Sequence, residues 1–94
     1  MRELDAIRAE LDAVDRDMVA LFEKRMLLAR EVAEYKLAHG LQVLDAAREA
    51  AVLQSRAAML QNACWAEDVR TLYGTIMTSS RGEQERCIRE AGQR

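Results

Sequence analysis

The sequence contains no proline and little glycine, cysteine or aromatic residue: it has 4 Gly, 2 Cys and 4% aromatics. The lack of proline leaves long stretches without the residue that most strongly interrupts a helix. The scarcity of aromatic and β-branched residues disfavours sheet. Ala, Leu, Glu, Arg, Met and Gln dominate instead, and all are good helix formers. We therefore predict a single all-α domain covering residues 1–94.

The same scarcities exclude several kinds of function. Cys64 and Cys87 lie far apart and the chain has one histidine, so we predict no metal site and assign the thiols no chemistry. The net charge of −2 is not that of a nucleic-acid-binding domain. The N-terminal residues 1–5 contain no apolar run typical of a signal or membrane segment. We expect a cytoplasmic protein with reduced thiols and no membrane partner.

What the chain does have is a long heptad pattern near its N-terminus. Ten residues follow one another at alternating steps of three and four: Leu4, Ile7, Leu11, Val14, Met18, Leu21, Arg25, Leu28, Val32 and Tyr35. These heptad positions predict one helix over about residues 3–38, with Gly40 as its C-cap.

The length of this helix predicts a homodimer. At 1.5 Å per residue it extends about 50 Å, whereas a compact chain of this size has a radius of gyration near 12 Å. One short chain cannot cover such a helix, and a second copy is the simplest cover. We therefore expect an intertwined homodimeric helical bundle.

Two further helices are predicted after the first. Asp45 is a suitable N-cap for a helix over about 45–61. Residues 62–65 break the pattern, and Glu67 and Asp68 suit the first turn of a third helix over about 66–89. We expect the tail after Arg89 to fray. The chain is thus a three-helix protein with one long N-terminal helix.

Two cations stand on the apolar face of the first helix. Arg25 occupies a core heptad position, where a charge is costly unless it is paired or meets a ligand. Pairing with a buried carboxylate that sets helix register is one interpretation, and binding of an anionic small molecule is the other. Lys36 follows eleven residues later on the same face, about 16 Å along the axis, although a lysine there can also extend to solvent.

Polar residues also interrupt the later helices. Ser80 and Gln84 lie one turn apart on the apolar face of the third helix, where partners in the core are the simpler explanation. Arg48 lies in the first turn of the second helix, against the preference of the helix dipole, beside Glu49. Together with Arg25 and Lys36, these residues indicate a polar pocket.

Arg8 fits such a pocket only across a subunit interface. It precedes Arg25 by seventeen residues, about 25 Å along the helix, so no ordinary metabolite touches both in one chain. Antiparallel pairing of two first helices, with the dimer axis near residue 19, brings Arg8 of one chain toward the Arg25–Lys36 stretch of the other.

Six short motifs follow one another along the chain: Ile7-Arg8, Val14-Asp15, Glu23-Lys24-Arg25-Met26-Leu27-Leu28-Ala29, Val32-Ala33-Glu34-Tyr35-Lys36, Val43-Leu44-Asp45-Ala46-Ala47-Arg48-Glu49 and Ser79-Ser80-Arg81-Gly82-Glu83-Gln84. Their order and spacing resemble the all-helical (type II) chorismate mutase family over about residues 4–88. The resemblance implies an intertwined dimer with two equivalent sites. It also implies a set of site residues: Arg8 from the partner, Arg25, Lys36, Asp45, Arg48, Glu49, Ser80 and Gln84.

The implied reaction is the intramolecular rearrangement of chorismate to prephenate, a step toward phenylalanine and tyrosine that calls for no cofactor. Catalysis then comes from holding the reactive conformer and stabilising charge on the ether oxygen. By resemblance, Lys36 and Gln84 donate to that oxygen, and Glu49 accepts from the ring hydroxyl. Arg8 and Arg25 clamp the carboxylates, with Ser80 assisting; Lys36, Gln84, Arg25 and Glu49 are the residues expected to be catalytic.

Three alternatives remain open at this stage. An isochorismate-pyruvate lyase of the same fold would keep the basic clamp, although Asp45, Arg48, Glu49 and Ser80 are more similar to the mutases. A 4-amino-4-deoxychorismate mutase is also possible, as is a non-catalytic domain that senses a pathway metabolite. The chain could further be one domain of a longer bifunctional enzyme.

Overall fold

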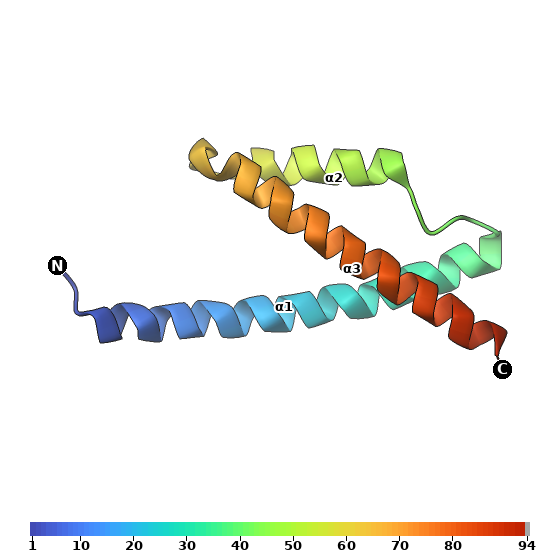
Figure 1. The fold of residues 1–94 in the computed structure, drawn as a ribbon, viewed down its shortest axis with the longest axis horizontal. Helices are drawn as coiled ribbons and strands as arrows, with labels where there is room; N and C mark the ends of the chain where they lie inside the picture. Colours follow the sequence, from blue (N-terminus) through green and yellow to red (C-terminus); the bar gives the residue numbers. More distant parts are fainter. Residues whose placement is uncertain (94) are drawn as a thin grey trace.

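The computed structural model describes residues 1–93, and this part of the chain is all-helical, without strands. Three α-helices and one short 3-10 helix follow in the order α1 (Leu4–His39), α2 (Ala46–Ala58), η1 (Ala63–Trp65) and α3 (Ala66–Gly92). The predicted all-α fold with one long N-terminal helix is therefore confirmed. In Figure 1, α3 begins beside the C-terminal end of α2, packs against α2, and then crosses α1 diagonally near the C-terminal end of α1.

The helix ends follow local chemistry. Gly40 ends α1 in the left-handed region, with φ at 66°, and its N–H donates to carbonyls of the last turn. The Asp45 side chain accepts from the backbone N–H of Arg48 at 3.0 Å and caps α2. α2 ends at Ala58, before the predicted residue 61, because Met59 and Leu60 bond three residues back in a tighter turn. α3 continues to Gly92, past Arg89, where fraying was expected.

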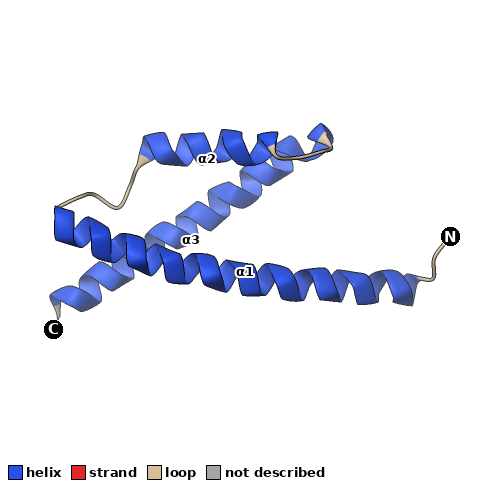
Figure 2. Cartoon of the chain, turned by 180° about the vertical axis from the view of Figure 1, so that it is seen from behind, coloured by secondary structure: helices blue, strands red, loops and turns tan. Residues whose placement is uncertain are grey.

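The heptad positions of α1 remain largely uncovered within one chain. Leu11 is 54% exposed and Leu21 65% exposed, and the buried residues of α1 are Ala29 and Ala33, which lie in the half crossed by α3. Figure 2 shows the N-terminal half of α1 extending away from the other helices. The chain measures 57 × 27 × 14 Å, far from the shape of a compact domain. A large apolar surface is thus left exposed on α1.

No helix within residues 1–93 has the length and apolar character needed to cross a membrane.

A buried carboxylate joins α1 to α3. Glu83 on α3 is 5% exposed and accepts from Arg30 of α1 at 2.8 Å; Arg86, one turn further along α3, also pairs with it. The hydrogen bond from Arg30 lowers the pKa of Glu83, and the effect of burial in the opposite direction is the smaller one. Burial raises the pKa of the neighbouring Cys87 thiol, which favours its neutral form.

Candidate active site

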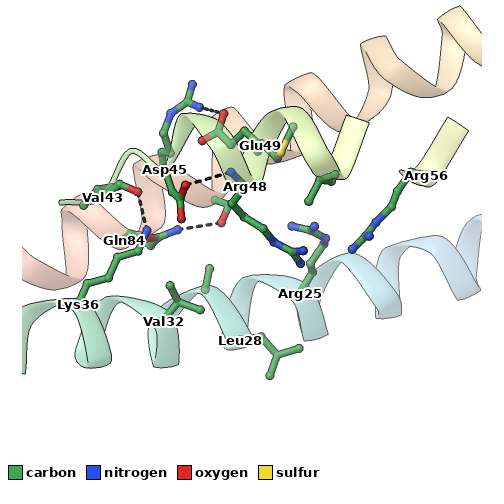
Figure 3. A pocket seen from close by; sticks show the side chains of 15 residues that line it. Arg25, Leu28, Val32, Lys36, Val43, Asp45, Arg48, Glu49, Arg56 and Gln84 are labelled. Atoms are coloured by element: carbon green, nitrogen blue, oxygen red, sulfur yellow. Dashed lines mark hydrogen bonds and ion pairs between the residues drawn. The ribbon is translucent and has the colours of Figure 1, made fainter. Parts of the chain in front are cut away.

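A cavity of about 450 Å³ opens between the C-terminal half of α1, the length of α2 and the middle of α3 (Figure 3). Its size is within the range of small-molecule sites. The lining residues are Arg25, Leu28, Ala29, Val32, Lys36, Val43, Asp45, Arg48, Glu49, Val52, Arg56, Met77, Ser80, Arg81 and Gln84. Apolar side chains form the walls, and five cations and two carboxylates project among them.

Seven of the eight residues expected in the site line this one cavity: Arg25, Lys36, Asp45, Arg48, Glu49, Ser80 and Gln84. They come from three helices and the α1–α2 connection, so the fold brings together positions up to 59 residues apart in sequence. Arg8 is the exception. It lies in the exposed N-terminal half of α1 and does not line the cavity of its own chain.

Lys36 and Gln84 form the hydrogen-bonding end of the cavity. The Lys36 ammonium donates to Oε1 of Gln84 at 3.0 Å and to the carbonyl of Val43 at 2.5 Å. Gln84 is 6% exposed, and its Nε2 donates to Oγ of Ser80 at 3.2 Å. An ammonium has three protons and a primary amide two, so each group keeps one donor for a ligand. This chain of contacts fixes both donors before any ligand arrives.

Glu49 faces the cavity from α2 as half of an ion pair. Its Oε1 accepts from the guanidinium of Arg81 on α3, an interaction that bridges the two helices. This hydrogen bond raises the pKa of Arg81 above its ordinary value, so Arg81 stays a cation throughout the neutral range. The second carboxylate oxygen of Glu49 has no hydrogen-bond partner among residues 1–93 and can accept from a ligand hydroxyl.

Arg25 projects from α1 into the cavity and has no carboxylate partner among residues 1–93. Its guanidinium lies instead over the ring of Tyr73, 5.7 Å from the ring centre. The interpretation of Arg25 as half of a buried register-setting pair therefore has no support among the residues that the structure describes. The buried carboxylate of Glu83 pairs instead with Arg30 and Arg86.

Sequence reasoning missed two charged members of the cavity lining, Arg56 and Arg81. Arg56 follows Arg48 by eight residues, about two helical turns, so its place on the same face of α2 was available from periodicity. Arg81 adjoins Ser80, but its pairing with Glu49 depends on how α2 and α3 pack. No rule of spacing predicts that contact.

The arrangement suits binding of a small anion with polar substituents. The arginines offer charge-assisted, two-pronged contacts to carboxylates, and Lys36 and Gln84 offer donors to an uncharged oxygen. Among the described residues, no three His, Cys, Asp or Glu side chains gather in a way that could hold a metal ion.

Comparisons with known proteins show what the sequence is similar to. The chain is 41% identical over 56 residues to the T-protein of Haemophilus influenzae, a match covering 60% of this chain and 15% of that protein. It is 43% identical over 54 residues to the T-protein of Enterobacter agglomerans, a match covering 57% of this chain and 14% of that protein. The chain thus matches about a seventh of the length of these relatives. The family model described as chorismate mutase type II matches residues 7–85, most of the sequence, and the chain belongs to that family.

Proposed function

We propose that this chain is a chorismate mutase, which rearranges chorismate to prephenate in phenylalanine and tyrosine biosynthesis. The observation that carries the proposal is the arrangement of the cavity, with fixed donors Lys36 and Gln84 at one end and unpaired arginines at the other. Family membership supports the same activity. On the sequence grounds given above, we expect the enzyme to act in the cytoplasm without a cofactor.

Catalysis by these residues is electrostatic. In the rearrangement one C–O bond breaks while one C–C bond forms within a single molecule, and no group is transferred to the protein. As the C–O bond stretches, negative charge grows on the ether oxygen. Lys36 and Gln84 stabilise that charge, and they need no reorganisation because their mutual contact already orients them.

The other polar groups hold the substrate in its folded, reactive conformer. Arg25 and Arg48 bind carboxylates. The free oxygen of Glu49 accepts from the ring hydroxyl while Arg81 anchors the other oxygen. Ser80, already bonded to Gln84, assists a carboxylate, and Asp45 fixes the start of α2 beneath Arg48.

A second copy of the chain completes the site in this proposal. The exposed apolar positions of α1 supply an interface, and antiparallel pairing about an axis near residue 19 brings Arg8 of the partner subunit toward Arg25. Sedimentation analysis should give twice the 10.7 kDa mass of the chain. A monomer at micromolar concentration contradicts this part of the proposal.

A direct assay tests the activity. Purified chain is expected to consume chorismate with formation of prephenate, and Arg25→Ala to lower kcat/KM by roughly 10²-fold or more, as for loss of a fixed charged contact. Parallel assays with isochorismate and with 4-amino-4-deoxychorismate separate the lyase and the amino-mutase alternatives. Tight chorismate binding without turnover indicates a sensing domain instead.

A further inference from the structure

Three guanidinium groups converge at one end of the cavity. Arg25 projects from α1, whereas Arg48 and Arg56 project from α2, and Figure 3 shows all three pointing toward one another. Arg56 is the member that neither the family resemblance nor the proposed mechanism uses. It is half-buried and lies two helical turns beyond Arg48 on the same face of α2.

None of these three arginines is neutralised within residues 1–93. The ion pairs in this part of the chain use other arginines. Among the described residues, the side chain of Arg56 donates only to the hydroxyl of Ser55, at 3.0 Å. Like charges that face one another repel, and the repulsion is strongest where the groups are partly removed from water. An arrangement of this kind is stabilised when an anion enters it.

One aromatic ring positions two of the three groups. The guanidinium carbons of Arg25 and Arg56 lie 5.7 Å and 6.0 Å from the centre of the Tyr73 ring. The ring thereby holds arginines from two helices that do not pack directly on each other, each attracted by its π-system. Because the ring already positions these two guanidinium groups, they lose little conformational entropy when they bind a carboxylate.

The other charged residues of the lining do not compete for this role. Glu49 is engaged by Arg81, and Asp45 caps its own helix. Lys36 lies with Gln84 at the far end of the cavity (Figure 3). The arginine end therefore keeps a surplus of positive charge that a dianion balances better than a monoanion.

We propose that Arg56 is an additional substrate-binding residue, which joins Arg25 and Arg48 in holding one carboxylate and makes the site selective for dianions. The inference rests on the proposed function, since it takes chorismate as the ligand. Arg56 contacts the carboxylate alike in the ground and transition states, because that group takes no part in bond making. Its loss should therefore raise KM and leave kcat nearly unchanged.

Calorimetric titration with prephenate, a dicarboxylate, tests Arg56 without turnover. Arg56→Gln and Arg56→Met keep good helix formers and should weaken binding by roughly ten- to hundredfold, as for loss of a charge-assisted hydrogen bond. Arg56→Lys retains the positive charge but cannot make the two-pronged contact of a guanidinium. Its affinity for prephenate should therefore lie between that of the wild type and that of the neutral variants. Arg89→Gln, at an exposed position of α3, is the matched control and should bind as the wild type does.

An affinity within twofold of wild type in a folded neutral variant overturns the proposal. Should both neutral variants fail to fold, the Nε resonance of Arg56 in the wild-type protein decides: it should shift on addition of prephenate, and an unchanged resonance rejects the contact. If the wild-type protein does not convert chorismate but binds prephenate more tightly than the neutral Arg56 variants do, the proposed function is wrong and the role of Arg56 in binding stands.

Discussion

At the scale of single residues, the sequence pointed to polar side chains where an apolar pattern is broken. Arg25 and Lys36 stood out because they interrupt the apolar face of α1, and both line the cavity. Arg56 and Arg81 did not, because a cation on a mixed helix face looks like ordinary solvated charge. Periodicity identifies an exception only against a regular background, so Arg56 on α2 and Arg81 on α3 were the harder cavity residues to find.

Lys36 carries the sharpest residue-scale prediction. Replacing it by Met removes the ammonium that Gln84 orients, so charge on the ether oxygen goes unstabilised and kcat should fall by roughly 10²-fold or more. Steady-state chorismate kinetics measure this. Lys24→Met is the matched control, an exposed position on the same helix, and should leave kcat unchanged. Comparable kcat values for Lys36→Met and wild type would reject the electrostatic mechanism.

At the scale of elements, the sequence predicted the helix caps but did not predict the side-chain contacts between helices. Gly40 and Asp45 were identified as caps from residue type and position, and both cap their helices. The buried contact of Glu83 with Arg30 was not foreseen, because the two residues lie 53 apart and meet only where α3 crosses α1. Local signals determine where helices begin and end, whereas crossing geometry determines which side chains pair.

The cap at Gly40 should be sensitive to a side chain. With φ at 66°, a β-carbon is strained even though open space surrounds it, so Gly40→Ala should lower the free energy of unfolding by about 1 kcal/mol. Gly74 lies inside α3, also with open space, and Gly74→Ala should raise stability by about 1 kcal/mol. Urea unfolding of both variants measures the contrast. Equal effects of the same sign would contradict this explanation.

The pairing of Glu83 predicts acid sensitivity of the α1–α3 contact. Its pKa is lowered in the folded state, so the stabilisation is present above the unfolded-state value near 4.5 and is lost as pH falls through the lower folded-state value. The free energy of unfolding, measured by denaturant titration from pH 7 to pH 3, should therefore decline below about pH 4.5.

Glu83→Gln separates this contribution from those of other carboxylates. The variant should be less stable at pH 7 because Arg30 and Arg86 lose their charged partner, and its stability should decline less steeply in acid. Glu34→Gln, at an exposed position of α1, should retain the wild-type profile. An unchanged acid slope in Glu83→Gln would show that the pair contributes no pH dependence.

At the scale of the whole molecule, the length of the first helix predicted an extended chain whose apolar face is not covered by the rest of the same chain. A radius of gyration of 16.9 Å exceeds the 12 Å or so of a compact chain of this length, and the apolar heptad positions of α1 stay exposed. The described residues therefore leave much of the apolar face of α1 uncovered. Which surfaces meet is a property of two chains, so the antiparallel pairing expected from Arg8 stays a prediction.

Subunit mixing tests the proposed site shared between two chains. Arg8→Ala and Arg25→Ala homodimers should each be nearly inactive, because every site lacks one arginine. In a heterodimer the Arg8→Ala chain keeps its own Arg25 and receives the partner's Arg8, so one of two sites is whole. After equal mixing with random exchange, half the dimers are mixed, and about a quarter of wild-type activity should return.

The recovery distinguishes the shared site from any role of Arg8 within its own chain. Arg8 and Arg25 of one chain are about 25 Å apart along α1, so a contribution in cis would act through stability and could not be complemented. Exchange is followed independently, by mass spectrometry of isotopically labelled chains. Complete exchange with no return of activity excludes donation of Arg8 across the interface. Recovery of about one quarter of the wild-type activity would link the length of α1 to catalysis. The part of α1 that extends beyond its own chain would then place Arg8 in the active site of the partner subunit.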